Sequence, residues 1–125
     1  DSGIKTRWAR RLLKQLSAGE KFSPTYPYPL HAWQLGKELL MIGMGAETVV
    51  DYALRFKSEF GPGTWVLGYS DDMISYIPSR RVWEEGGYEG GYNLYEYGRP
   101  AYRWKGDIEE RIAVAVQRLI KQVRS

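Results

Sequence analysis

The spacing of hydrophobic residues divides the chain into helical and strand-like segments. In residues 3–18 an apolar side chain recurs every fourth position, which predicts an amphipathic helix that stops at Gly19. The apolar positions of this helix are Ile4, Trp8, Leu12 and Leu16. The three prolines of residues 22–30 then predict an extended connector without a regular hydrogen-bond ladder.

Two strands and a hairpin are predicted next. The runs "HAWQL" at 31–35 and "ELLMIGM" at 38–44 are separated by Gly36 and Lys37, a pair that suits a hairpin turn. The second run is nearly all apolar. This composition favours a strand that is buried on both faces, as in layered α/β domains.

A second helix is predicted in "AETVVDYALRFKSEF", residues 46–60, because apolar side chains again recur at helical spacing. Its first turn would contain Glu47. The apolar positions of this segment are Val49, Val50, Ala53, Leu54 and Phe56. The run "TWVLGYS" at 64–70 then predicts another buried strand.

The last third of the chain predicts a short helix near residues 79–85, an irregular Gly- and Tyr-rich segment at 86–106, and a final helix from about Asp107, which is placed to cap it. The apolar stripe of the final helix is Ile108, Ile112, Ala115, Val116, Leu119 and Val123. Together the elements predict the α/β class: a small mixed sheet of about three to four strands with three main helices, as a fragment of a larger layered catalytic domain.

The chain has 125 residues, with five Trp, ten Tyr and no cysteine. This length suits one domain, 1–125, since single domains commonly have ~100–150 residues. The lack of cysteine excludes disulfides and thiolate chemistry within these residues, and no apolar run approaches the ~20 residues that span a bilayer. The start, "DSGIKTRWARR", has neither an initiator Met nor the apolar stretch of a signal peptide, so we expect a cut inside a longer protein.

Positive charge is concentrated at the beginning of the chain. Residues 1–21 contain six basic and two acidic side chains, a net charge of +4, whereas the whole chain has a net charge of +3. A basic helix of this kind can contact nucleic acid or an anionic membrane. Its apolar stripe instead favours a helix that packs by one face and leaves its charges in solvent, so we expect no nucleic-acid partner.

The stretch "GMGAET", residues 43–48, has two glycines between a strand and a helix and is similar to a phosphate-binding turn. The third glycine is missing and Glu47 would repel a phosphate, so we exclude a dinucleotide site. Glu47 itself has two interpretations. It is either a first-turn carboxylate that the helix macrodipole stabilises, or a functional residue.

His31 is the only histidine, and no recognisable spacing of metal ligands surrounds it. Nothing in the sequence brings it together with Ser70 or Ser75 and an aspartate as a catalytic triad, so we expect a structural role. Asp71 and Asp72 follow a strand. Adjacent carboxylates on an extended segment point to opposite sides, which excludes an acid/base pair across one substrate.

Tyrosines and glycines are concentrated in "GYSDDMISYIPSRRVWEEGGYEGG", residues 68–91, and further tyrosines follow. On loops, phenols can line a pocket, donate a hydrogen bond to a developing oxyanion or ligate a metal as phenolates. The alternative is that they pack and hydrogen-bond beneath the loop. The tyrosines concerned are Tyr76, Tyr88, Tyr92, Tyr95 and Tyr97.

The order "HAWQLGKELLMIGMGAET" and then "WVLGYSDDMISYIPSRRVWEEGGYEGG" resembles the late part of the catalytic domain of the neutral/alkaline non-lysosomal ceramidases. That family has a strand ending in a Gly-Glu turn, a helix, a strand leading to Gly-x-Ser-Asn, and a Tyr-Glu pair. The resemblance covers about residues 28–98. Its most specific feature is the spacing of twelve residues between Tyr76 and Tyr88, the second of which opens "YEGG"; Asp71 stands where the family usually has Asn.

The resemblance implies a zinc-dependent amidase that cleaves the N-acyl bond of ceramide. Glu47 and Tyr76 match zinc ligands of the family, and Tyr88 matches a tyrosine that assists at the scissile amide. The other zinc ligands are histidines from the earlier half of the family's catalytic domain, which also supplies a serine and which this chain lacks. The glycines around Tyr88 would let the loop carry its ring back over the metal.

On this basis we expect part of a zinc-dependent amidohydrolase for ceramide or a related lipid, incomplete and inactive as this chain alone. The expected partners are the N-terminal half of the same catalytic domain and a ceramide-like lipid or amide substrate, with a membrane-surface association. The resemblance also implies a secreted, periplasmic or membrane-associated protein. The alternative is a non-enzymatic module whose Gly/Tyr-rich loop binds a glycan or a lipid headgroup.

Overall fold

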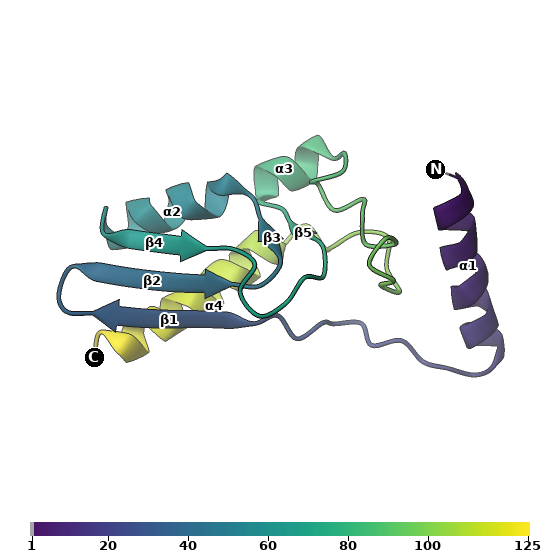
Figure 1. Ribbon diagram of the computed structural model, residues 1–125, viewed down its shortest axis with the longest axis horizontal. Coiled ribbons are helices and arrows are strands. Elements are labelled where there is room, and N and C mark those ends of the chain that lie inside the picture. Colours follow the sequence, from purple (N-terminus) through teal and green to yellow (C-terminus); the bar gives the residue numbers. More distant parts are fainter. Residues whose placement is uncertain (1) are drawn as a thin grey trace.

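The computed structural model describes residues 2–125 and has at its centre a three-stranded sheet with the order β1-β2-β4 (Figure 1). The strands are β1 (Leu30–Leu35), β2 (Leu39–Met44) and β4 (Thr64–Leu67). β1 and β2 form an antiparallel hairpin, whereas β2 and β4 are parallel and are joined through helix α2 (Val50–Phe60). The predicted hairpin and the predicted mixed α/β class are confirmed.

The chain also forms a second, two-stranded parallel sheet. This sheet consists of β3 (Glu47–Thr48) and β5 (Tyr76–Ile77), with Glu47 opposite Tyr76 in the register. The Glu47 N–H donates to the Ser75 carbonyl at 3.1 Å, so its backbone is tied into this ladder. The prediction that Glu47 lies in the first turn of a helix is therefore wrong, because α2 begins only at Val50.

Three further helices complete the chain: α1 (Ser2–Ser17), α3 (Arg80–Glu85) and α4 (Ile108–Val123). The predicted three long helices and one short helix are confirmed, as is the irregular segment between α3 and α4, which we name the tyrosine loop (residues 86–106). Asp107 occupies the N-cap position of α4, but its side chain makes no capping hydrogen bond, unlike the prediction. None of the helices in residues 2–125 has the length and apolar character that a membrane crossing requires.

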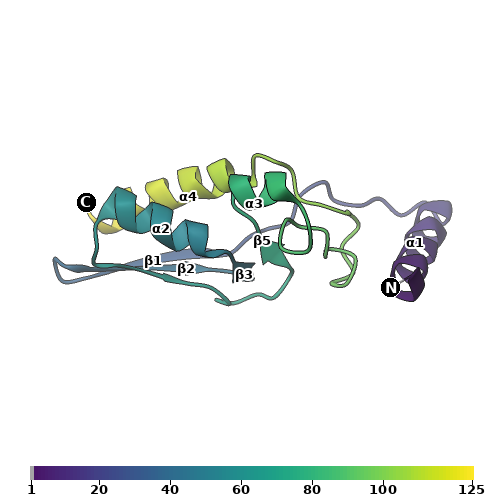
Figure 2. The same ribbon diagram turned by 90° about the horizontal axis from the view of Figure 1, so that it is seen from above.

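The core lies between the three-stranded sheet and helices α2 and α4, which cover the same face of the sheet (Figure 2). Burying one large aliphatic or aromatic side chain contributes about 1.5–3 kcal/mol, so this layer is the main source of stability. The fully buried members include Leu40, Ile42, Met44, Tyr52, Phe56 and Val116.

Only part of the apolar set predicted for α2 is buried: Phe56 lies in the core as predicted, but so does Tyr52, which was not predicted. Tyr52 and Phe56 face the core, whereas Val50 and Leu54 are exposed, Leu54 by 62%. The Tyr52 hydroxyl donates to the Pro78 carbonyl at 2.9 Å. This bond joins α2 to the segment after β5 and accompanies the burial of the Tyr52–Phe56 face.

The opposite face of the three-stranded sheet is not covered by α2 or α4. Trp33, Met41 and Trp65 form one row across β1, β2 and β4 on this face, and Trp33 and Trp65 are 48% and 55% exposed. The prediction of a buried strand is wrong for β4, whose Trp65 and Leu67 are exposed, whereas β2, for which burial on both faces was predicted, has no exposed residue. The alternation along each strand follows the pleat, which turns consecutive side chains to opposite faces.

Helix α1 stands away from the sheet and packs on the tyrosine loop (Figure 1). The Trp8 indole N–H donates to the Arg99 carbonyl at 2.7 Å, and the Arg11 guanidinium donates to the Gly98 carbonyl at 2.8 Å. Gly19 has a φ of +81°, a left-handed conformation that suits glycine at the predicted end of the helix. The apolar stripe of α1 is buried only in part, since Leu16 is exposed.

Candidate functional site

Glu47 and Tyr76 are neighbours across the β3–β5 ladder. They are register partners, and the Glu47 carboxylate next to the Tyr76 phenol raises the pKa of Tyr76. Both side chains are half-buried. Because the ladder fixes both backbones, the two oxygen-bearing side chains converge without depending on a mobile loop.

Tyr88, on the tyrosine loop, contacts this pair through Tyr76. Its ring contacts the ring of Tyr76 edge to face, with centroids 5.6 Å apart and an interplanar angle of 72°. Its hydroxyl donates to the Glu96 carboxylate at 2.7 Å, a bond that raises the pKa of Tyr88 to about 12. Tyr88 is therefore a protonated hydrogen-bond donor at neutral pH. Glu47, Tyr76 and Tyr88 lie in one cluster.

Tyr69 belongs to the same cluster, and the sequence interpretation missed it. The Glu47 carboxylate next to its phenol raises the pKa of Tyr69 to about 12. The sequence could have indicated Tyr69 by its position, because it lies two residues after the carboxyl end of β4, where α/β proteins place functional side chains.

The backbone of the tyrosine loop has its own supports. Gly86 and Gly87 have φ values of +78° and +72°, so they turn the chain sharply after α3 and bring Tyr88 back towards β5. The Asn93 amide then donates to the Tyr88 carbonyl at 3.0 Å. Asn93 is fully buried, which makes it a fixed anchor for the residue that carries the phenol.

Within the tyrosine loop, the guanidinium group of Arg103 lies against two aromatic rings. Its guanidinium carbon lies 3.8 Å from the centroid of the Trp83 ring and 4.6 Å from that of Tyr92. Its Nε donates to the Gly90 carbonyl at 3.2 Å. Tyr92 therefore has a packing role, which was the second interpretation of the loop tyrosines.

Trp104 connects the tyrosine loop to the strand that carries Tyr76. Its indole N–H donates to the Ser75 hydroxyl at 2.9 Å and to the Tyr76 carbonyl at 3.1 Å. The Ser75 hydroxyl in turn donates to the Tyr76 carbonyl at 2.8 Å. Ser75 is buried and occupied by these bonds, so it is not positioned as a nucleophile.

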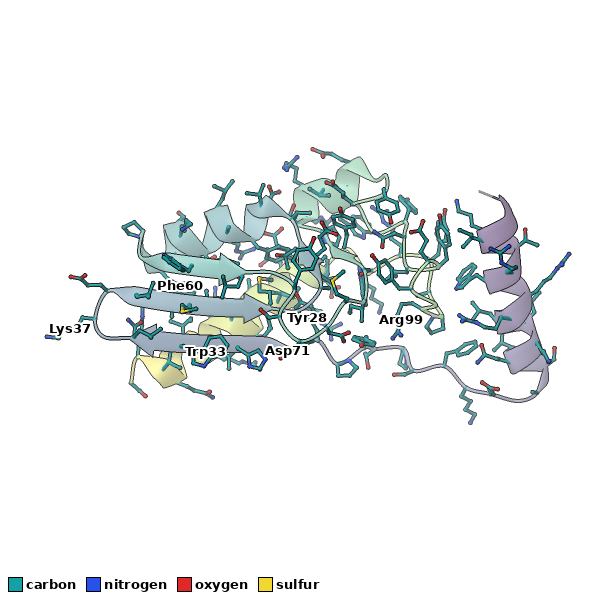
Figure 3. All side chains as sticks on the ribbon, in the orientation of Figure 1. Tyr28, Trp33, Lys37, Phe60, Asp71 and Arg99 are labelled. Carbon is teal, nitrogen blue, oxygen red and sulfur yellow. The ribbon has the colours of Figure 1, made fainter. Side chains whose placement is uncertain are left out.

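His31, Asp71 and Asp72 pair with residues outside the Glu47 cluster. The His31 Nε2 pairs with the Asp71 carboxylate, and its ring stacks on Trp33 with centroids 5.4 Å apart; Trp33 and Asp71 are seen beside β1 in Figure 3. Asp72 instead accepts a hydrogen bond from the Tyr26 hydroxyl. The aspartates have separate partners, as their adjacent positions predicted.

A shallow, open depression of about 370 Å³ lies beside Tyr88. Its lining comes from α3 and the start of the tyrosine loop: Arg81, Val82, Glu85, Gly86, Tyr88 and Glu89. Glu47 and Tyr76 do not line it, so it borders the cluster on the side of Tyr88 only. An extended group that reaches Tyr88 from this side would meet both acidic and basic side chains.

The cluster offers few donors to a metal ion. Within residues 2–125, no three His, Asp or Glu side chains are arranged to hold one. Glu47 and Tyr76 present a carboxylate and a phenol oxygen, donors that suit zinc in a mixed nitrogen and oxygen shell. By themselves these two residues supply two oxygen donors, fewer than the about four ligands that a structural zinc ion takes.

Comparison with known proteins leaves the family open. No protein-family model, no curated protein and no solved structure matches this chain. Function therefore has to be inferred from the side chains of the site, together with the resemblance in the sequence.

Proposed function

We propose that this chain is part of a zinc-dependent amide hydrolase similar to the neutral ceramidases, and that it acts on the N-acyl bond of ceramide or a related lipid. The observation that carries the proposal is the pairing of Glu47 with Tyr76 across β3 and β5, with the Tyr88 ring against Tyr76. These three residues are far apart in the sequence. The resemblance assigns all three to one reaction centre.

Each residue has a defined task in this proposal. Glu47 and Tyr76 would hold the zinc together with histidines from the N-terminal half of the same catalytic domain. When bound, zinc supplies a Lewis acid that polarises the amide carbonyl and lowers the pKa of bound water. Tyr88 keeps its proton at neutral pH and exchanges its bond with Glu96 for a bond to the carbonyl oxygen, where negative charge develops.

The uncovered face of the three-stranded sheet supports the N-terminal half as a partner. Exposed apolar patches larger than a few hundred Å² are rare on soluble monomers and commonly mark interaction sites. The outward side chains of the strands are His31, Trp33, Leu35, Leu39, Met41, Trp65 and Leu67, and none of them is Lys, Arg, Asp or Glu. A lipid substrate agrees with a membrane-surface association and with a secreted, periplasmic or membrane-associated protein.

The decisive experiment measures zinc and hydrolysis in a protein that joins this chain to the N-terminal half. Glu47→Gln and Tyr76→Phe are each expected to lose stoichiometric zinc and fatty-acid release from an N-acyl sphingosine. Tyr88→Phe is expected to keep zinc and to lose about 10²–10³-fold in kcat, as removal of an oxyanion donor does. Glu84→Gln, a change at an exposed carboxylate of α3 that does not line the depression, serves as the control. Full zinc content in Glu47→Gln would rule the proposal out.

The isolated chain provides a second check. Because two oxygen ligands without histidines rarely hold zinc, calorimetry is expected to find weak binding or none, and no hydrolysis. Tight stoichiometric binding by residues 1–125 alone would contradict the sharing of ligands between two halves.

The second candidate is a binding module for a glycan or a lipid headgroup. It is favoured by the exposure of the Tyr88 and Tyr102 rings on the tyrosine loop. Titration with glycans and with lipid vesicles separates the two candidates. Saturable binding that Tyr102→Phe weakens and Glu47→Gln leaves unchanged would favour the module over the hydrolase.

A further inference from the structure

Helix α1 lies at one end of the molecule, beyond the tyrosine loop, in both views of the fold (Figure 1, Figure 2). Trp8 and Arg11 bind carbonyls of the loop, and Ile4 lines the shallow groove between helix and loop with them. These positions are spaced at i, i+4 and i+7, so they occupy one side of the helix. The opposite side of α1 therefore faces away from the loop.

We name this opposite side the outer face of α1. It carries Arg10, Leu13, Lys14 and Leu16, which are neighbours at helical spacings of three and four residues. Leu13 and Leu16 are 63% and 54% exposed, and neither belongs to the core. Packing within residues 2–125 therefore does not explain why two adjacent leucines occupy this face.

The cations of the outer face have no acidic partner in the described part of the chain. None of the ion pairs in residues 2–125 involves a side chain of α1. The acidic side chain nearest along the sequence is that of Glu20, which accepts a hydrogen bond from Gln15 at 2.9 Å. The outer face thus combines exposed apolar side chains with uncompensated positive charge.

We propose that the outer face of α1 binds the surface of a bilayer that contains anionic lipids. A helix of this kind lies in the plane of the interface, with its leucines between headgroups and acyl chains and its long basic side chains at the phosphates. The leucines favour a bilayer over nucleic acid, whose phosphates would engage the cations alone. The inference does not rest on the amide hydrolase, because α1 carries none of the residues proposed for that reaction.

Co-sedimentation of the chain with lipid vesicles tests the role of charge. The chain is expected to bind vesicles of equimolar phosphatidylcholine and phosphatidylserine, but not vesicles of phosphatidylcholine alone. Each cation near an anionic surface contributes roughly fivefold in affinity, so Arg10→Gln with Lys14→Gln should weaken binding about 25-fold. Arg118→Gln with Lys121→Gln removes two exposed charges from α4 and should change binding little. Equal losses in the two double variants, or no binding to the mixed vesicles, overturn the inference.

The leucines separate a bilayer from a nucleic acid. Leu13→Ala with Leu16→Ala should weaken binding to the mixed vesicles at least about tenfold, because less apolar surface enters the lipid. Leu54→Ala with Val114→Ala, at exposed positions of α2 and α4, is the matched control and should not weaken it. Vesicle binding that survives the loss of Leu13 and Leu16 overturns the inference, and tight binding of duplex DNA by that variant would then identify a nucleic-acid surface.

A single fluorescent label locates the face that touches the bilayer, because the chain has no cysteine of its own. A polarity-sensitive fluorophore on Leu16→Cys should shift to the blue when the mixed vesicles are added, and the same fluorophore on Leu54→Cys should not. If the Leu16→Cys label does not shift and Tyr102→Phe weakens binding, the lipid is held by the tyrosine loop and the inference is wrong.

Discussion

The layer formed by the sheet with helices α2 and α4 buries aliphatic and aromatic side chains, whereas the tyrosine loop and α1 are joined by ring contacts and by hydrogen bonds to main-chain carbonyls. The first region gains its stability from apolar area. The second depends on bonds of defined direction, each of which contributes about 0.5–1.5 kcal/mol net. The β3–β5 ladder, which carries Glu47 and Tyr76, lies between the two regions in space (Figure 1).

This difference assigns different tasks to the two regions. Apolar burial is non-directional and tolerates small displacements, so it suits a scaffold. Directional bonds fix the places of individual side chains, which a reaction centre requires. Changes in the apolar layer should therefore unfold the whole molecule, while changes in the tyrosine loop should disturb the cluster around Glu47 first.

The largest effect is expected in the apolar layer. Phe56→Ala should lower the free energy of unfolding by about 3–5 kcal/mol, because a fully buried ring is removed and a cavity is left. Leu54→Ala, two residues away on the exposed face of α2, should change it by no more than about 0.5 kcal/mol. Urea unfolding followed by circular dichroism measures both. Similar losses in the two variants would mean that α2 packs by the other face.

A smaller and more local effect is expected at Trp104. Trp104→Phe keeps an aromatic ring but removes the donor to Ser75 and the Tyr76 carbonyl, at a cost of about 1–3 kcal/mol. Amide hydrogen exchange should become faster at Tyr76 and Ile77 than in β2.

Trp33→Phe, on the uncovered face of the sheet, is the control for the loss of an indole. Uniform acceleration of exchange across both regions in Trp104→Phe would contradict a local role for this bond.

The smallest effect expected is a loss of stability of the apolar layer at high pH. Burial raises the pKa of Tyr52, so the stability that this phenol contributes is fully present below pH 10 and is lost as the pH rises from 10 through the folded-state pKa. Between pH 8 and pH 11 the loss from this one group should be about 1.4 kcal/mol. Tyr52→Phe should show a correspondingly smaller loss over this range, measured by urea unfolding at each pH.

Val116→Ala provides the matched control for this measurement. It truncates a fully buried side chain without a titratable group, so it should follow the pH dependence of the unmutated chain. If Tyr52→Phe loses as much stability between pH 8 and pH 11 as the unmutated chain, alkaline sensitivity does not arise from the apolar layer.

The order and type of the main elements could be predicted from the sequence, because hydrophobic periodicity, prolines and glycines act over short distances along the chain. Gly19 and Gly86 end helices as predicted, and the hairpin at Gly36 was predicted from its turn residues. The resemblance also selected Glu47, Tyr76 and Tyr88, which lie in one cluster. Their roles in catalysis stay a prediction.

Three features were decided only by tertiary structure. The pairing of β3 with β5 made Glu47 a strand residue, and the packing of α2 selected Tyr52 over Val50 and Leu54 for burial. The third feature is the left-handed backbone of Tyr69, whose N–H donates to the Ala46 carbonyl. The physical reason is shared: strand register, the choice of a helix face and a left-handed backbone depend on partners distant in the chain, which no local pattern records.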